Sequence, residues 1–189
     1  MVARWEPDSR GRLEQAALDL FFERGFDETT VEAIASRAGV TERTFFRHFA
    51  DKREVLFGRS QELCDLLVAA MDDVFDPARP MDAVVAAFEA AGSLLGQRRD
   101  HSMRRQAVIM ANAELREREL IKMFAIARAV TDTLRERGVA DPAATLAAEA
   151  GVAVFRVAFE RWVEPAETRD LTQLVQDTFV EMQAVTKRR

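Results

Sequence analysis

Hydroxyl and guanidinium side chains gather at helical spacing between positions 41 and 47. In a helix over this stretch, Thr41, Arg43, Thr44 and Arg47 would lie on the face turned away from Phe45. A guanidinium fork can bind the O6 and N7 atoms of guanine or a phosphate, and a hydroxyl can bind a base edge or a phosphate. An ordinary solvated helix face uses the same residue types. Composition alone favours that simpler interpretation, so the surrounding elements must decide.

Two short helices would position this group. Apolar residues recur every three or four positions between 31 and 38, and Thr29 stands three residues before Glu32, a capping-box spacing, which predicts a helix over residues 30–38. Thr41 is a suitable N-cap for a second helix, which follows almost at once. Gly39 can supply the positive φ that a tight turn requires. The pattern predicts a helix-turn-helix, whose second helix can lie in the major groove of DNA.

The remainder of the chain is also predicted to be helical. No segment shows the period-two alternation of a strand, which indicates an all-α fold of about nine helices. We expect an N-terminal three-helix helix-turn-helix domain over residues 1–51 and a C-terminal helical bundle over residues 52–189, with the helix over 52–75 connecting them. The other helices are predicted over residues 9–24, 81–95, 102–113, 115–137, 142–163 and 170–187.

The charge of the chain is unevenly distributed. The formal net charge over all 189 residues is −5, which at first argues against a nucleic-acid partner. Residues 37–59, however, hold six cations and three anions and carry +3, so the rest of the chain carries −8. The acidity therefore belongs to the remainder of the chain, and the predicted helix-turn-helix is basic.

Several other classes of protein are disfavoured by the sequence. No apolar run approaches the ~18 residues of a membrane span, and the first residues lack the apolar run of a signal peptide, so we expect a cytoplasmic protein without membrane contact. Cys64 is the single cysteine and lies far from both histidines, so we expect no metal site and no cofactor. Glycine-rich phosphate loops and nucleophile motifs are absent, so we do not expect an enzyme.

Two alternatives remain at this stage. One is an enzyme that uses carboxylates and His101 inside a helical bundle, and the other is a helical interaction module that does not bind DNA. The enzyme is supported only by residue types that any chain contains. The interaction module need not keep together the set that this chain has, which is Thr41, Arg43, Thr44, His48 and Lys52. DNA binding therefore remains the favoured hypothesis.

The order of residues in this region resembles a known family. Residues 29–35 read TTVEAIA, residues 38–49 read AGVTERTFFRHF, and Lys52, Val55 and Leu56 follow. This pattern, over about residues 9–57, is similar to the DNA-binding domain of the tetracycline-repressor (TetR) family of bacterial transcriptional regulators. The resemblance implies a homodimeric repressor that binds a double-stranded, pseudo-palindromic DNA operator. It further implies a C-terminal bundle that senses a small-molecule effector and releases the DNA, with the helix over 52–75 as the connecting lever.

The resemblance also implies roles for individual residues. Thr30, His48 and Lys52 fall on phosphate-contacting positions. The family often has tyrosine where this chain has Phe46, whose ring is left to contact sugar or a thymine methyl. Arg43 is the residue we expect to bind guanine in a bidentate manner. The predicted DNA-binding set is Thr30, Thr41, Arg43, Thr44, Phe46, Arg47, His48 and Lys52.

The C-terminal part offers a possible effector pocket. Methionine and aromatic side chains adapt to apolar ligands, and an arginine that points inward would orient a ligand. Close packing of the same side chains in a core is the simpler alternative. The candidate pocket residues are Phe88, Met103, Arg104, Met110, Met123, Phe124, Phe155 and Arg156.

The last two predicted helices carry persistent apolar stripes. Two such helices from each of two copies would form a four-helix interface across a two-fold axis. Packing within one chain would produce the same stripes. The candidate interface residues are Val154, Ala158, Trp162, Leu171, Leu174, Val175, Thr178, Phe179 and Met182.

Overall fold

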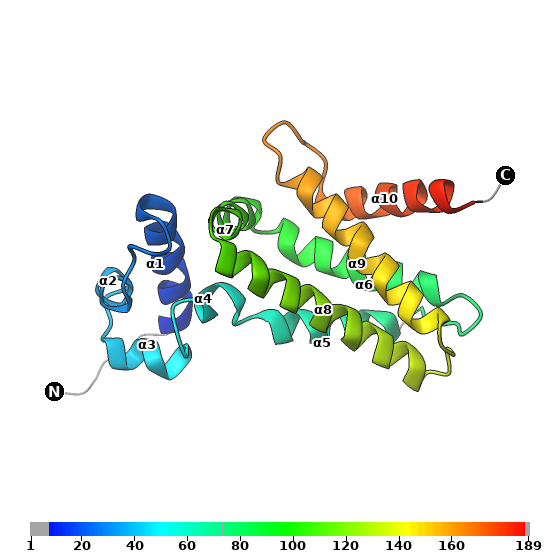
Figure 1. Ribbon diagram of the computed structural model, residues 1–189, viewed down its shortest axis with the longest axis horizontal. Helices are drawn as coiled ribbons and strands as arrows, with labels where there is room; N and C mark the ends of the chain where they lie inside the picture. The colour runs from blue at the N-terminus through cyan, green and yellow to red at the C-terminus, as the bar shows by residue number, and fades with distance from the viewer. Residues whose placement is uncertain (1–7, 73, 188–189) are drawn as a thin grey trace. The chain divides into compact units, whose positions relative to one another are not determined.

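The computed structural model describes residues 8–72 and 74–187, and these residues form helices and no strand (Figure 1). Nine of the helices have seven residues or more and one, α4, has four, which confirms the all-α prediction of about nine helices. The predicted first domain began at residue 1, but residues 1–7 lie outside the described part. The helices are α1 (Ser9–Arg24), α2 (Val31–Arg37), α3 (Glu42–His48), α4 (Glu54–Phe57), α5 (Ser60–Asp72), α6 (Pro80–Gly96), α7 (Arg99–Ala111), α8 (Ala113–Glu136), α9 (Ala143–Trp162) and α10 (Leu171–Thr186).

The predicted connecting helix over residues 52–75 is broken, and this expectation was wrong. Asp51 accepts a hydrogen bond from the backbone N–H of Glu54 at 2.9 Å, which caps the short α4. The carbonyl of Gly58 accepts a hydrogen bond from the guanidinium of Arg10 at 2.8 Å. Glycine is a poor helix former, and a side chain bound to its carbonyl competes with the next helical hydrogen bond. No continuous helical lever therefore runs from Lys52 into the bundle.

The start of α2 also differs from the prediction. Thr30, not Thr29, is the N-cap, and its hydroxyl accepts a hydrogen bond from the N–H of Ala33 at 3.1 Å. Thr29 is buried, and its hydroxyl donates to the carbonyl of Gly25 at 2.8 Å. Both positions carry threonine, which is a suitable N-cap residue, but the capping-box spacing to Glu32 fitted only Thr29. Because Thr29 is buried and its hydroxyl is bonded to Gly25, Thr30 is the residue that caps α2.

The chain forms two compact units. Unit 1 comprises the residues up to Arg59 together with Arg104–Arg116, and unit 2 comprises Ser60–Met103 and Glu117–Arg189. The boundary predicted at residue 51 therefore lies inside unit 1. The later segment joins unit 1 through its apolar residues Val108, Ile109 and Leu115, which are buried in the same core as α1 and α3.

Polar contacts also hold this later segment within unit 1. Arg105 donates from Nε to the carbonyl of Leu56 at 2.9 Å, and Arg104 forms an ion pair with Asp19 at 3.2 Å. Asn112 accepts from the N–H of Leu115 at 3.2 Å, which caps the first turn of α8. Apolar periodicity alone could not show that this segment belongs to the first unit.

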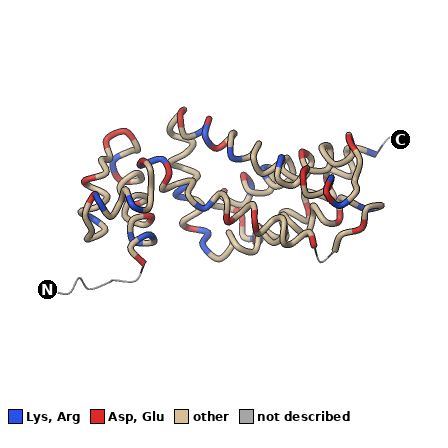
Figure 2. Tube along the Cα trace, turned by 90° about the horizontal axis from the view of Figure 1, so that it is seen from below, with Lys and Arg blue, Asp and Glu red and all other residues tan. Residues whose placement is uncertain are grey.

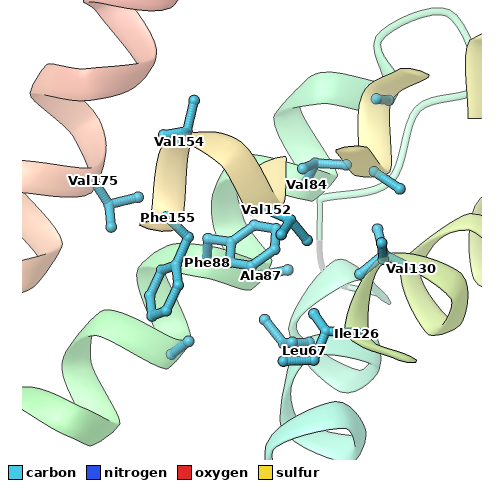
Figure 3. Close-up of a cluster of buried hydrophobic side chains, with 14 of the residues drawn as sticks. Leu67, Val84, Ala87, Phe88, Ile126, Val130, Val152, Val154, Phe155 and Val175 are labelled. Carbon is cyan, nitrogen blue, oxygen red and sulfur yellow. The ribbon is translucent and has the colours of Figure 1, made fainter. Parts of the chain in front are cut away.

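Unit 2 is built on close helix packing. Helix α6 packs against α5, α9 and α10, and the rings of Phe88 and Phe155 lie 5.3 Å apart in its core (Figure 3). Gly151 lets α9 approach α6 closely, because a Cβ atom at position 151 would lie 2.4 Å from Cγ1 of Val84 on α6. None of the described helices is long and apolar enough to cross a membrane.

The predicted dimer-interface residues lie mostly inside this core, which corrects their assignment. Eight of the nine are at most 6% exposed within a single chain, and Met182 is partly buried against them. A side chain already packed in its own protomer has no surface left for a second copy. The residues concerned are Val154, Ala158, Trp162, Leu171, Leu174, Val175, Thr178, Phe179 and Met182.

Candidate nucleic-acid interface

The turn between α2 and α3 fixes the direction of the second helix. Gly39 has a φ of 68°, as its position in the turn predicted. The N–H of Val40 donates to the carbonyl of Ala35 at 2.9 Å, and the N–H of Gly39 donates to Ser36 at 3.1 Å. These two bonds form a Schellman motif, which satisfies the last carbonyls of α2. The sequence therefore builds a defined turn rather than a loose linker.

Helix α3 begins with its own cap and has two distinct faces. The hydroxyl of Thr41 accepts from the N–H of Thr44 at 3.2 Å and lies 3.1 Å from the hydroxyl of Thr44. Phe45 and Phe49 are 0% and 2% exposed, and they anchor the inner face of α3 in the core of unit 1. Thr44 is half-buried beside this anchor.

The outer face of α3 presents four neighbouring side chains. Glu42, Arg43, Phe46 and Arg47 are all exposed, and they are spaced so that each lies one helical turn from another. Phe46 is 56% exposed although it packs edge-on against Phe45, with ring centroids 5.4 Å apart. A large exposed aromatic on the same face as two guanidinium groups suits contact with bases and sugars.

Ion pairing concentrates the available positive charge on α3. Arg37 pairs with Glu23 at 3.0 Å, Arg59 pairs with Glu14 at 2.9 Å, and Arg53 pairs with Asp51 and Glu114. Basic and acidic residues are interspersed along the whole trace (Figure 2). The +3 of residues 37–59 is thus largely neutralised by neighbours, several of them outside that window. Between residues 37 and 59, two arginines have no carboxylate partner among the described residues, and these are Arg43 and Arg47.

His48 occupies the end of α3. Its Nε2 lies 2.8 Å from the hydroxyl of Ser9 and 3.5 Å from the guanidinium of Arg47. Burial lowers the pKa of His48 below its ordinary value, and the positive charges of Arg47 and Arg10 lower it further. Burial and the two neighbouring cations thus favour the neutral form of the imidazole. In the tautomer that lets Ser9 donate to Nε2, the Nδ1–H remains as a neutral donor.

Lys52 is engaged within unit 1. Its ammonium donates to the carbonyls of Phe26 at 2.8 Å, Thr29 at 3.0 Å and Asp27 at 3.1 Å, and it lies 4.4 Å from the centroid of the Phe26 ring. An ammonium has three N–H donors, so the carbonyls occupy all of them. The phosphate contact expected at this position would require Lys52 to leave these acceptors. Lys52 instead links the loop after α3 to the loop before α2 through these hydrogen bonds.

Replacing Lys52 by methionine should lower the free energy of unfolding by about 1–3 kcal/mol, because carbonyls left without a donor in a partly buried site cost that much. Urea unfolding followed by circular dichroism measures the change. Arg47→Met is the matched control, since Arg47 is exposed and its loss should leave stability within about 0.5 kcal/mol. Unchanged stability in Lys52→Met, with DNA affinity lost on every sequence, would contradict the structural role and restore the phosphate contact.

The remaining predicted DNA-binding residues lie near α3. Thr30 is exposed at the N-terminus of α2, where a helix end favours a phosphate. The structure thus brings Thr30, the α3 residues and His48 to the surface of unit 1, while Lys52 points into it. Ion pairs within this unit are formed by Arg10, Glu14 and Arg53, to which the sequence analysis gave no role.

The predicted effector-pocket residues are divided by the structure. Phe88 and Phe155 are buried in the core of unit 2, and Met123 packs against that core. Four others lie on the surface, which corrects their assignment to a cavity. They are Arg104, paired with Asp19; Arg156, paired with Glu160 at 3.2 Å; Met110, 54% exposed; and Phe124, 66% exposed. Met103 is half-buried and is not part of the core cluster.

Two family profiles match the chain. Residues 14–57 match the profile described as bacterial regulatory proteins of the tetR family, and residues 78–187 match the MftR C-terminal domain. The second match covers more than half of the 189 residues.

Curated relatives and solved structures agree with these matches. TcmR of Streptomyces glaucescens, an HTH-type transcriptional regulator, is 39% identical over 92 residues, which cover 49% of this chain and 39% of TcmR. KstR2 of Mycobacterium tuberculosis, an HTH-type transcriptional repressor, is 35% identical over 83 residues, which cover 43% and 42%. The chain thus spans about two fifths of the length of these relatives.

A solved structure matches over nearly the whole fold. Thermus thermophilus FadR, a TetR-family repressor in complex with lauroyl-CoA, aligns with a TM-score of 0.59 at 22% identity and covers 95% of this chain and 96% of that chain. At this identity the likeness shows the fold alone. The relatives named above are regulators and not enzymes. Together with the helix-turn-helix and the two profile matches, they show that this chain belongs to the TetR family of bacterial transcriptional regulators.

Proposed function

We propose that the chain binds double-stranded DNA as a homodimer, with α3 of each copy in the major groove of a pseudo-palindromic operator. The outer face of α3 carries this proposal, because Arg43, Phe46 and Arg47 are exposed together on a helix held by a capped turn. Two recognition helices related by a two-fold axis read half-sites about one helical turn, ~34 Å, apart. The proposed place of action is the cytoplasm, where a bacterial operator lies.

A small-molecule effector is the second part of the proposal. The solved FadR neighbour contains lauroyl-CoA, and unit 2 of this chain has a large apolar core around Phe88 and Phe155. Thr178 is 5% exposed in that unit, and its hydroxyl has no hydrogen-bond partner among the described residues. An unsatisfied hydroxyl in an apolar setting is a polar group that a ligand could satisfy. We therefore propose an effector with an apolar chain, bound in unit 2.

Release of DNA follows from differential affinity. An effector shifts the chain away from the DNA-binding state only if it binds the other state more tightly. Because α4 and α5 are separate helices, the shift need not pass along one rigid rod. The name of KstR2, a transcriptional repressor, supports a repressor function for this chain. Expression of the repressed gene should then rise when the effector is added.

Selection from a pool of random duplexes tests this function. The full chain should enrich an inverted repeat with half-site centres 10–11 base pairs, or a multiple, apart, as expected for two helices one turn apart. Failure to enrich any sequence, or enrichment of a single asymmetric half-site, would contradict the dimeric DNA-binding function. Placed before a reporter promoter, the selected site should lower reporter output, and raised output would indicate an activator.

The same duplex tests the effector class. Lauroyl-CoA should release the selected DNA in a fluorescence anisotropy titration, while coenzyme A alone should not. Release by both compounds would point to the nucleotide part as the ligand. Release by neither would contradict an acyl chain as the recognised feature while leaving DNA binding intact.

A further inference from the structure

Glu42 is an acidic residue on the face of α3 that otherwise carries positive charge. It is the first residue of this helix and is exposed next to Arg43, one turn before the exposed ring of Phe46. Among the described residues, no hydrogen bond or ion pair engages its carboxylate. Four other carboxylates of unit 1 are each paired with an arginine at 2.6–3.2 Å, and these are Glu14, Asp19, Glu23 and Asp51. The carboxylate of Glu42 is therefore open to contact with another molecule.

A carboxylate on this face opposes binding to DNA in general. Each phosphate of the DNA backbone is negative, and a protein gains affinity by neutralising phosphates with lysine and arginine. A negative side chain beside Arg43 and Phe46 reduces that gain on every sequence to which it makes no favourable contact. Glu42 therefore lowers DNA affinity unless a base in the groove donates a hydrogen bond to it.

The major groove offers few donors to a carboxylate. Cytosine presents its N4 amino group there, and adenine presents its N6 amino group beside the acceptor N7. Guanine presents the acceptors N7 and O6, and thymine presents the acceptor O4. Both oxygens of an ionised carboxylate are acceptors, so guanine and thymine repel it, and the N7 atom of adenine repels one of its two oxygens. Cytosine is therefore the base that best suits the carboxylate of Glu42.

We propose that Glu42 is a specificity-determining residue of α3, whose carboxylate accepts a hydrogen bond from the N4 amino group of a cytosine in each half-site. The inference rests on the proposed function, because it requires α3 to lie in the major groove. Glu42 directly precedes Arg43, and consecutive Cα atoms are about 3.8 Å apart, close to the ~3.4 Å rise between base pairs. The cytosine thus lies within about two base pairs of the guanine that Arg43 binds. By repelling other bases, Glu42 widens the difference in affinity between the operator and other DNA.

Selection from random duplexes with variants of Glu42 tests this role. The unaltered chain should enrich cytosine at one position of each half-site. Glu42→Gln should enrich adenine at that position instead, because an amide binds the N6 and N7 atoms of adenine in a bidentate manner. Glu42→Ala should enrich no base there, while the rest of the inverted repeat is unchanged. A change from cytosine to adenine is a result that a purely structural role of Glu42 would not produce.

Affinity on defined duplexes gives a second measurement. In fluorescence anisotropy, replacing the selected cytosine by thymine in both half-sites should weaken binding by the unaltered chain about tenfold or more, and binding by Glu42→Ala less than about threefold. Glu42→Ala should also bind scrambled DNA more tightly than the unaltered chain does, because a repulsive charge is removed. Glu32→Ala is the matched control, since Glu32 is exposed in the first turn of α2 and should leave the selected bases unchanged.

Three results would contradict this role of Glu42. The Glu42 variants could select the same bases as the unaltered chain, the position that changes could hold a base other than cytosine in the unaltered chain, or Glu32→Ala could cause the same change. In each case the inverted repeat is still selected, so the proposed function stands and only the role of Glu42 is wrong. An unaltered chain that enriches no inverted repeat would instead remove both. Circular dichroism should show all variants folded, and the nearly isosteric Glu42→Gln keeps the test valid if Glu42→Ala unfolds.

Discussion

Replacing Arg43 by alanine should weaken binding to the selected operator by about 2–6 kcal/mol per dimer. One bidentate contact between an arginine and guanine contributes about 1–3 kcal/mol of base discrimination, and a two-fold complex contains two such contacts. Arg43 has the geometry for this contact, because it is exposed on the outer face of α3 and the described residues give it no carboxylate partner. Fluorescence anisotropy with the selected duplex and with a scrambled duplex measures the loss.

Two controls separate base reading from simple charge. Arg43→Lys keeps the charge but loses the guanidinium fork, so it should lose affinity for the operator and keep most of its affinity for scrambled DNA. Arg37→Ala removes an equal charge whose side chain is already bound to Glu23, so it should change operator affinity little. Equal losses on operator and scrambled DNA for Arg43→Ala would show that Arg43 contributes charge alone.

The local elements near α3 could be predicted because their signals are local. Gly39 supplies the positive φ of a tight turn, Thr41 caps α3, and Phe45 with Phe49 forms the buried face. Each of these depends on residues within about one helical turn of one another, which a single sequence displays directly. The short break at Gly58 was missed because it depends on Arg10, 48 residues away.

The charge and burial of other residues could not be predicted for the same reason. Lys52 meets three carbonyls more than 20 residues earlier in the chain, and Arg59 meets Glu14, so the basic window looked more positive than it is. An apolar stripe such as that of Trp162 and Phe179 is identical whether it faces a core or a second copy. Only the packing of one protomer distinguishes the two.

Two adjacent phenylalanines on α3 should give opposite results when each is replaced by alanine. Phe45→Ala should lower the free energy of unfolding by about 3–5 kcal/mol, because its fully buried ring would leave a cavity in the core of unit 1. Phe46→Ala should change it by no more than about 0.5 kcal/mol, since its ring is 56% exposed. Urea unfolding of both variants, followed by circular dichroism, measures the difference.

DNA affinity should depend on Phe46, the residue whose replacement hardly changes stability. For folded protein well below its unfolding transition, Phe46→Ala should still lose operator affinity, because the missing ring no longer contacts sugar or a thymine methyl in the groove. That loss should shrink when the duplex carries deoxyuridine in place of thymidine, since the methyl group is then already absent. Full affinity in Phe46→Ala would show that the exposed ring faces solvent in the complex. Stability lost at Phe45 and affinity lost at Phe46 would together establish that one seven-residue helix is anchored by one aromatic ring and reads DNA with its neighbour.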